Sequence, residues 1–359
     1  MTLTTDEIRD SLEQGYTLPA SWYSDPDIAR LERDRVFRRS WQYAGPAEQV
    51  AEPGQFFSTR VGPIPVLVVR DKQGDLRGFV NVCRHRAHIV AEGSGRRETL
   101  QCPYHAWTYD LDGCLRSAPR SDREPGFEKE SFSLLPVSVT QVGPLVFANP
   151  DPLAGPLDAV LGVIPAALAE GGVDLDRLRL RRRFNWAQDT NWKVGIENYL
   201  ECYHCAVAHP GLAKRIDVSA DNYELRWQGH VASQFGYPRK PEQLTGASVT
   251  RAQYHLLWPN TTFNTELGPM NLSIDVSLPD GAGKVSGFSD FYFDPDTPDD
   301  EVEELIAFAR TVDQEDADLV RSVQSGLDSG MVEQGRLLTN AEHQIGTFQR
   351  MLFEAIASG

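Results

Sequence analysis

Residues 83–107 read CRHRAHIVAEGSGRRETLQCPYHAW and bring two cysteines and two histidines close together in the chain. They form the pairs Cys83-x-His85 and Cys102-x-x-His105, although the whole chain has only five cysteines and eight histidines. Thiolates and imidazoles are ligands that proteins use for zinc and for iron–sulfur clusters. The stretch therefore predicts a metal site with these four side chains as ligands.

Two metal groups fit this set of ligands. One tetrahedral zinc ion would bind all four side chains. A Rieske [2Fe–2S] cluster would bind both cysteines through one iron and both histidines through the other, which raises its reduction potential relative to a four-cysteine cluster. Small zinc fingers fold only because of their metal. This motif lies instead in a β-rich region of roughly a hundred residues, long enough for a core of its own. We therefore favour the cluster, with zinc as the alternative.

The regions around the motif predict an α+β protein with two domains. Residues 40–155 contain short β-rich runs separated by Gly and Pro turns, which indicates an antiparallel β domain. Residues 1–39 predict a helical segment that packs on the second domain. Residues 156–359 pass from a strand to a helix and back to strands, and they end in predicted helices over 299–329 and 331–357.

Composition and charge exclude several classes of protein. A formal charge of −16 argues against binding to nucleic acid. The acidic N-terminus has no apolar stretch, and the longest apolar run, VLGVIPAALA, is broken by Pro165 and is too short to span a bilayer. We expect a cytoplasmic protein with no membrane segment. In that compartment an odd number of cysteines argues against a disulfide framework.

A second candidate metal site lies in ENYLECYHCAVAHP, residues 197–210. His204 and His209 are five residues apart, which on a regular helix would turn their side chains about 140° away from each other. Pro210 disfavours helical geometry at His209, so the helix should end or distort there and let the second imidazole swing round. Two imidazoles and one carboxylate would form the facial triad of non-haem Fe(II) oxygenases.

The late helix offers four carboxylates for the third position. They are Asp313, Glu315, Asp316 and Asp318. Projection at about 100° per residue places Asp316 near the middle of the apolar face and Asp318 on the opposite side. A lone carboxylate on a buried face is costly unless it is paired or bound to a metal. Asp316 is therefore the predicted ligand, and a buried salt bridge to an arginine is the alternative.

Three further residues of the second site have more than one interpretation. Glu201 lies close to the helix face of His204. Its possible roles are a fourth ligand, a solvated helix residue or an acceptor for an imidazole N–H. The pair Cys202-x-x-Cys205 has the spacing of a redox dithiol, but its place among candidate ligands makes a thioredoxin-like role a minor alternative.

At this point the chain resembles the α subunits of Rieske non-haem iron oxygenases. The resemblance extends over YSDPDIARLERDRVFRRSWQYAG, the Cys83/His85/Cys102/His105 motif, NWKVGIENYLECYHCAVAHP and EDADLVRSVQSGL. It implies a Rieske domain followed by a helix-grip (START-like) catalytic domain, assembled head to tail as a homotrimer. In that arrangement Glu201 would connect His204 to His105 of the neighbouring subunit. Many family members have aspartate at this position. The resemblance also suggests that Asn198 orients a ligand or lines the site, although it is equally compatible with an ordinary helix residue.

The resemblance implies an oxygenase that activates O₂ at Fe(II) held by His204, His209 and Asp316, as a monooxygenase or dioxygenase. The [2Fe–2S] cluster would supply the electrons. The chain has no GxGxxG after a strand and no cysteine cluster of plant-ferredoxin spacing. Electrons from NAD(P)H should therefore arrive through a separate flavin or iron–sulfur reductase, with or without a ferredoxin.

The substrate is less clearly indicated. ENYLECYHC and LLWPNTTFNTELGPMNLSI are most similar to the glycine betaine, choline and carnitine oxygenases, which favours hydroxylation or N-dealkylation of a quaternary amine such as a betaine. Aromatic rings bind such cations, and the candidates are Tyr254, Trp258, Phe263 and Phe235, with a place in the core as their other interpretation. The rival substrate is an aromatic compound or aromatic acid, for which Arg239 and Lys240 are candidate partners. From other classes, a Rieske electron-transfer protein or a zinc-binding module without oxygenase activity remain alternatives.

Overall fold

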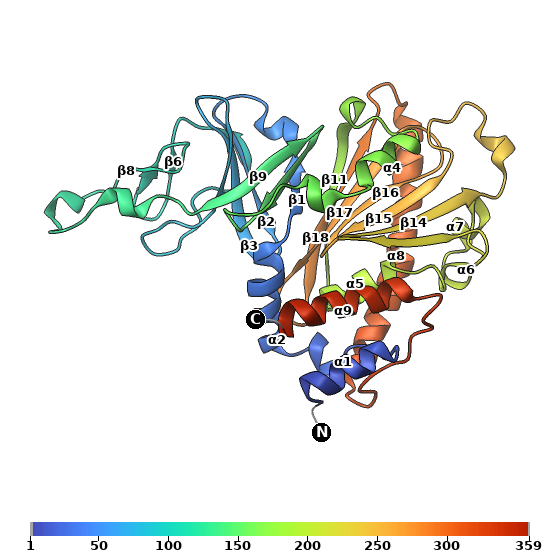
Figure 1. Cartoon of the computed structure of the whole chain (residues 1–359). Coiled ribbons are helices and arrows are strands. Elements are labelled where there is room, and N and C mark those ends of the chain that lie inside the picture. Colours follow the sequence, from blue (N-terminus) through green and yellow to red (C-terminus); the bar gives the residue numbers. More distant parts are fainter. Residues whose placement is uncertain (1–2, 358–359) are drawn as a thin grey trace. The chain divides into compact units, whose positions relative to one another are not determined.

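The computed structural model describes residues 3–357, which divide into two compact units (Figure 1). The smaller unit runs from Phe37 to Leu157, and it includes the predicted domain of residues 40–155. The larger unit combines the chain up to Val36 with the chain from Asp158 onward. The N-terminal helical segment and the predicted catalytic domain thus lie in one unit.

The smaller unit is built from antiparallel sheets. A seven-stranded sheet has the order β1-β10-β9-β4-β3-β2-β5, and a three-stranded sheet has the order β6-β7-β8. The strands are β1 Gln42–Pro46, β2 Gln55–Val61, β3 Ile64–Arg70, β4 Leu76–Val80, β5 Ser94–Arg96, β6 Leu100–Gln101, β7 Thr108–Tyr109, β8 Leu115–Ser117, β9 Pro136–Val142 and β10 Leu145–Asn149. Short 3₁₀ turns lie at Phe37–Arg39, Ala47–Val50, Ser121–Arg123 and Lys129–Phe132.

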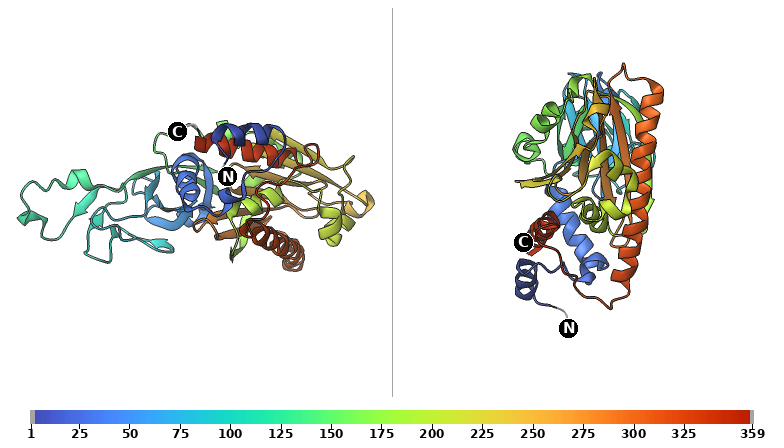
Figure 2. Two further views of the ribbon diagram at one scale, coloured as in Figure 1. Left: turned by 90° about the horizontal axis from the view of Figure 1, so that it is seen from below. Right: turned by 90° about the vertical axis from the view of Figure 1, so that its right-hand side faces the viewer.

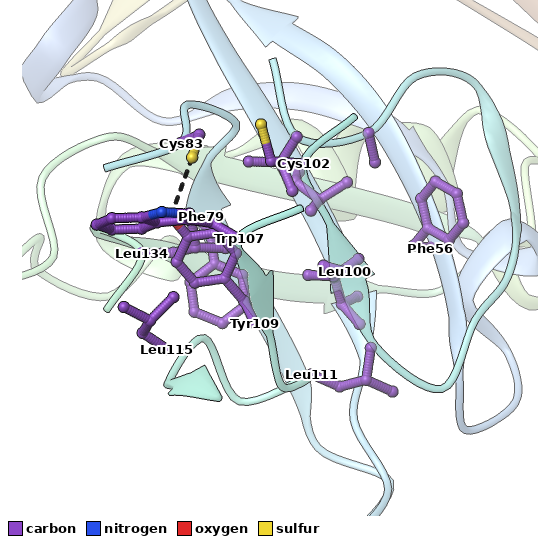
Figure 3. Close-up of a cluster of buried hydrophobic side chains, with 14 residues drawn as sticks. Phe56, Phe79, Cys83, Leu100, Cys102, Trp107, Tyr109, Leu111, Leu115 and Leu134 are labelled. Atoms are coloured by element: carbon purple, nitrogen blue, oxygen red, sulfur yellow. Dashed lines mark hydrogen bonds between the residues drawn. The ribbon is translucent and has the colours of Figure 1, made fainter. Parts of the chain in front are cut away.

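Strand β3 explains why this sheet is buried on both faces. Its residues Val66, Leu67, Val68 and Val69 are all fully buried. Because successive side chains of a strand point to opposite faces, Val66 and Val68 enter one core, whereas Leu67 and Val69 enter the other. The second core also contains Cys83, Cys102 and Tyr109 (Figure 3), so the metal loops are attached to a packed apolar layer.

The larger unit contains an antiparallel sheet of order β11-β18-β17-β16-β15-β14-β12, with β13 paired to β14. Its strands are β11 Arg179–Gln188, β12 Ile216–Asp217, β13 Glu224–Gln228, β14 Val231–Pro238, β15 Ala252–Leu257, β16 Thr261–Thr265, β17 Asn271–Pro279 and β18 Val285–Phe293. Its helices are α1 Thr5–Glu13, α2 Pro26–Leu31, α3 Asp158–Leu161, α4 Ile164–Glu170, α5 Trp192–Tyr199, α6 Cys205–Ala208, α7 Pro210–Arg215, α8 Asp299–Asp328 and α9 His343–Ala357. A π-helical turn spans Glu32–Val36, and 3₁₀ turns span Ala20–Tyr23, Leu175–Arg177 and Pro241–Leu244.

The long helix α8 crosses one side of this sheet (Figure 2). Acidic residues 299–301 occupy its first turn, where negative charge interacts favourably with the helix dipole. Val302, Leu305 and Ile306 then pack against Phe291 and Phe293 of β18. The same helix continues past α5, which precedes the predicted iron-binding segment, so it can carry the predicted ligand Asp316 there.

The ends of the chain pack on each other in the larger unit. Helices α1 and α9 lie side by side (Figures 1 and 2). The predicted helix over 331–357 begins only at His343, so its first part is wrong. The reason is local hydrogen bonding: the carbonyls of Glu333 and Gly335 accept from the backbone of Ala20 and Thr17, at 2.8 and 3.1 Å, which a helix would not allow.

No helix within residues 3–357 is long and apolar enough to cross a membrane.

Candidate metal centres and active site

The two loops of the Cys/His motif have matching backbones. Each cysteine carbonyl accepts a hydrogen bond from the residue four positions on, Ala87 at 3.1 Å and Ala106 at 3.0 Å. Both alanines have positive φ, 58° and 57°. Each cysteine N–H donates to the carbonyl five positions on, at 2.8 Å for Cys83 and 2.9 Å for Cys102. The two loops therefore repeat one tight-turn geometry, each with one cysteine and one histidine.

The side chains of this motif are gathered and free to bind. The rings of His85 and His105 lie 4.6 Å apart, and Trp107 stacks on His85 at 5.0 Å. Cys83 and Cys102 are free thiols, although both are buried. Partial desolvation and the neighbouring His85 lower the pKa of His105, which favours the neutral imidazole that binds metals.

The pairing of these ligands suits a cluster. Ligands of one tetrahedral zinc ion lie within about 4 Å of one another, because Zn–S and Zn–N bonds are about 2.0–2.3 Å long. Among the described residues, the only group of three or more potential ligands whose atoms all lie within 4.8 Å is His204, His209 and Asp316. In the first motif the ligands form two pairs instead: the rings of His85 and His105 lie 4.6 Å apart, and Cys83 and Cys102 interact with each other. They fit a two-iron cluster better than one zinc ion.

The second motif adopts the broken-helix geometry that its proline predicts. Helix α6 ends at Ala208, His209 has φ −118° and ψ 69°, and Pro210 starts α7. This break turns the two imidazoles toward each other, with their Nε2 atoms 3.1 Å apart.

Asp316 from α8 completes a three-atom cradle with these histidines. Its Oδ1 lies 3.0 Å from His209 Nε2 and 3.5 Å from His204 Nε2. Adjacent ligands about 2.1 Å from a metal ion are about 3 Å apart, so the three atoms fit one face of an iron centre. Asp313, one turn earlier on α8, faces the cavity next to this centre, and Asp318 is exposed and paired with Arg321.

Each ligand is oriented by a second polar side chain. Nδ1 of His204 donates to Glu201, and Nδ1 of His209 donates to Glu315 at 2.8 Å. Asn198 donates to Asp316 Oδ1 at 2.7 Å. With each Nδ1 carrying the proton, both Nε2 atoms keep a lone pair for a metal. The role of Glu315 was missed from the sequence, where it was considered only as a ligand. Its position beside the predicted ligand was the one available signal.

The electrostatics of the cradle suit a cation. Although burial lowers the pKa of His204, hydrogen bonds with Asp316 and Glu201 raise it to about 9. Burial raises the pKa of Asp316, but its hydrogen bonds with both histidines hold it well below its ordinary value. The pocket therefore stabilises positive charge, which a divalent ion would supply.

A cavity of about 480 Å³ begins at these three residues. Its walls come from α5, α8 and the inner faces of β11 and β14–β18. Of the four aromatic residues suggested for this pocket, only Tyr254 borders it; Trp258, Phe263 and Phe235 are buried in the core. Arg239 and Lys240 do not border it either, and Arg239 pairs with Asp217 at 3.6 Å. Tyr199 and Tyr223 border it instead.

Cys202 and Cys205 form a disulfide beside His204. This is a single local disulfide between residues three apart rather than the disulfide framework that the cysteine count argued against. The turn from Glu201 into α6 brings their Cα atoms to 4.9 Å, within the range that a disulfide spans.

A β domain with paired Cys/His loops and a sheet-and-helix domain with a His/His/Asp cradle together define the oxygenase component of a Rieske non-haem iron oxygenase. Family models agree: residues 40–137 match the Rieske [2Fe–2S] domain, and residues 175–358 match the ring hydroxylating alpha subunit (catalytic domain). The chain belongs to this family. The predicted family and α+β fold are confirmed.

Several relatives resemble the chain over nearly its whole length. The carnitine monooxygenase oxygenase subunit of Acinetobacter pittii is 33% identical, with 94% of each chain covered. The chloroplastic choline monooxygenase of Arabidopsis thaliana is 33% identical, covering 90% of this chain and 79% of the relative. A solved quaternary ammonium Rieske monooxygenase in complex with L-carnitine is 31% identical, with a TM-score of 0.84 and 99% of each chain covered.

The chain is therefore the terminal component of a Rieske oxygenase. Its cofactors are a [2Fe–2S] cluster and a mononuclear iron, its co-substrate is O₂, and electrons from NAD(P)H reach it through a separate reductase. This outcome confirms the predicted enzyme class and cofactors, and excludes a zinc-binding module or a pure electron-transfer protein.

Proposed function

We propose that this oxygenase acts on a quaternary ammonium compound, by hydroxylation or N-dealkylation. The observation that carries the proposal is the 480 Å³ cavity, which places tyrosine rings and carboxylates next to the His204/His209/Asp316 cradle. Aromatic faces and negative charge are what a permanent organic cation requires. Relatives named for carnitine and choline oxidation support the same substrate class.

We assign the four residues of the first motif to the cluster and the His204/His209/Asp316 cradle to the iron. When bound, this iron activates O₂ with electrons relayed by the cluster. With three protein ligands, the iron would keep positions for O₂. Glu201 and Glu315 hold the Nδ1 protons of the two histidines, and Asn198 holds Asp316 in place. Such outer partners typically change metal affinity or activity by 10–100-fold.

We further propose a head-to-tail homotrimer in the cytoplasm. His105 and Tyr104 lie on the exposed side of their loop, and Tyr203 and Val207 are exposed beside Glu201. In a head-to-tail ring, His105 of one subunit would approach Glu201 of the next, so that electrons cross between subunits. The reductase would be a flavin and iron–sulfur protein, with or without a ferredoxin.

The proposal is tested with the iron-loaded protein and an NADH-driven surrogate reductase. O₂ consumption and product formation are measured with choline, carnitine, glycine betaine and benzoate. We expect product-coupled O₂ uptake with at least one quaternary amine and its loss in Asp316→Ala, which should lose mononuclear iron but keep the cluster's visible spectrum. Coupled turnover of benzoate alone would contradict the proposal.

A further inference from the structure

Three carboxylates border the cavity without a role in the iron centre: Glu266, Asp275 and Asp313. Glu266 directly follows β16, Asp275 lies on β17, and Asp313 is one turn before Asp316 on α8. Burial and the charges of Asp275, Asp316 and Glu266 raise the pKa of Asp313 well above its ordinary value. The three acids therefore lie within electrostatic reach of one another around one cavity.

Glu266 is only half satisfied by the protein. Tyr254 donates a hydrogen bond to its Oε1 at 2.9 Å, whereas its Oε2 is buried and accepts no hydrogen bond. The charge of Arg215 acts on Glu266, but this guanidinium donates to the Leu267 carbonyl at 3.0 Å and lies 4.4 Å from the Phe308 ring. A buried carboxylate oxygen without a partner is costly. A cation in the cavity would offset that cost.

The polar wall follows from the strand pattern. On β17, Ile274 and Val276 are buried and do not border the cavity, whereas Asp275 lies on the alternate face that does. Its partner across the ladder is Thr262, which donates to Asp275 Oδ2 at 3.3 Å; Asn264 donates to the same oxygen at 2.7 Å. These contacts fix the carboxylate in place, as a binding site requires.

Three tyrosines complete this wall, and each hydroxyl is held by a neighbour. Tyr199 donates to Asn264 at 2.7 Å, Tyr223 donates to Gln234 at 3.1 Å, and Tyr254 donates to Glu266. With the hydroxyls anchored, the rings remain next to the cavity. Their faces attract cations, and the attraction grows when water is excluded.

Positive charge is scarce on the same wall. Outside the iron ligands, the only cationic side chains among the described lining residues are Arg310 and Arg321 of α8. Arg310 lies 4.7 Å from the Phe184 ring, and Arg321 pairs with Asp318 at 2.8 Å. Both are exposed. A substrate carboxylate in this cavity would therefore face three acidic side chains, of which Glu266 and Asp275 are half-buried, and two arginines that already have other partners.

We infer that the cavity selects a quaternary ammonium compound that carries no carboxylate, such as a quaternary amino alcohol, and that Glu266, Asp275 and Asp313 provide this selectivity. The inference rests on the proposed function for the reaction itself. Beyond the proposed function, it states that the end of the substrate opposite the ammonium group carries no negative charge. Burial raises the pKa of Glu266 to about 7, and a bound cation would favour its ionised form.

The first test compares choline with glycine betaine, which differ mainly by a hydroxyl in place of a carboxylate. Coupled O₂ consumption of the complete enzyme gives kcat/KM for each. We expect choline to be favoured by tenfold or more, equivalent to about 1.4 kcal/mol. Equal or better use of glycine betaine would overturn the inference while leaving the proposed function intact.

The second test measures binding by calorimetry to the iron-loaded enzyme, with choline and its neutral analogue 3,3-dimethylbutan-1-ol. We expect Glu266→Gln and Asp313→Asn to weaken choline binding tenfold or more and to leave the neutral analogue within about twofold. Asp318→Asn, a matched change on α8 at a position that does not border the cavity, should change neither. Equal weakening of both ligands would reveal a structural role and overturn the inference. Choline binding that depends on Glu266 but gives no turnover would support the inference and contradict the proposed function.

Discussion

The hydroxyl of Tyr109 is placed to tune the reduction potential of the cluster. It accepts a hydrogen bond from the Arg84 N–H at 3.0 Å and lies 3.3 Å from Cys83 Sγ, to which it can donate (Figure 3). A hydrogen bond to a ligand sulfur stabilises the reduced, more negative cluster.

Tyr109→Phe should therefore lower the midpoint potential by roughly 40 mV, since a net hydrogen bond is worth about 1 kcal/mol. A redox titration followed by electron paramagnetic resonance measures this shift. An unchanged potential in a variant with a full cluster would contradict the role.

Glu197 should make stability depend on pH. Burial raises its pKa to about 7, although hydrogen bonds from Gln349 and Tyr23 lower it in part. The folded state therefore holds this proton in a range where the unfolded chain, with its ordinary value of 4.5, has lost it. Stability from this group is complete below pH 4.5 and is lost as the pH rises through 7.

The variant Glu197→Gln isolates this contribution. Because glutamine does not ionise, the difference in unfolding free energy between pH 5 and pH 8 should shrink by up to about 3 kcal/mol. Urea denaturation at the two pH values measures it. Glu130→Gln, an exposed change in the other unit, is the control. An unaltered pH dependence would show that Glu197 is ionised in the folded protein.

At the scale of elements, a buried ion pair connects α5 to the N-terminal segment. Lys193 Nζ lies 2.5 Å from Glu32 Oε1, and Trp192 Nε1 donates to Glu32 Oε2 at 2.9 Å; neither charged side chain is more than 2% exposed. Glu32→Leu would leave a buried ammonium without its partner, so we expect a loss of about 3–5 kcal/mol. In the double variant Glu32→Leu/Lys193→Met most of this loss should disappear, because no charge is left buried. Urea denaturation of both variants measures this. Equal losses in both would mean that packing, rather than charge, holds α5.

At the same scale, local features of the site could be predicted from the sequence, whereas features that depend on tertiary packing could not. The two Cys/His loops and the break at Pro210 are local features, since turn geometry and a missing N–H act within a few residues. Asp316 could be chosen because helical periodicity relates it to neighbours on the same element. The cavity wall could not be predicted in this way. Glu266 and Asp313 are distant in sequence, and their meeting depends on how the sheet packs against α8.

The same limit applies to the chain segment before α9. Nothing within residues 331–342 forbids a helix, and the prediction was wrong because these residues hydrogen-bond to the chain near Thr17. The aromatic residues of the late strands illustrate it again: Trp258 packs on Phe348 at 5.1 Å, so a partner from α9 decides that this ring belongs to the core. Tertiary partners, rather than local propensity, determine these positions.

For the whole molecule, the proposed head-to-tail trimer predicts that two inactive variants restore activity together. Cys83→Ser should lose the cluster, and His204→Ala should lose the mononuclear iron, so each variant alone should be inactive. If electrons pass from the cluster of one subunit to the iron of the next, every mixed trimer contains one productive pair. Purification through two different affinity tags keeps only mixed trimers, in which one of the three cluster–iron pairs is productive, so activity should return to about a third of that of the wild type. Co-expression with two different affinity tags, followed by coupled O₂ consumption of the doubly purified protein, measures this. Mixed oligomers without activity, but with both metals present in the expected amounts, would mean that electrons do not cross between subunits.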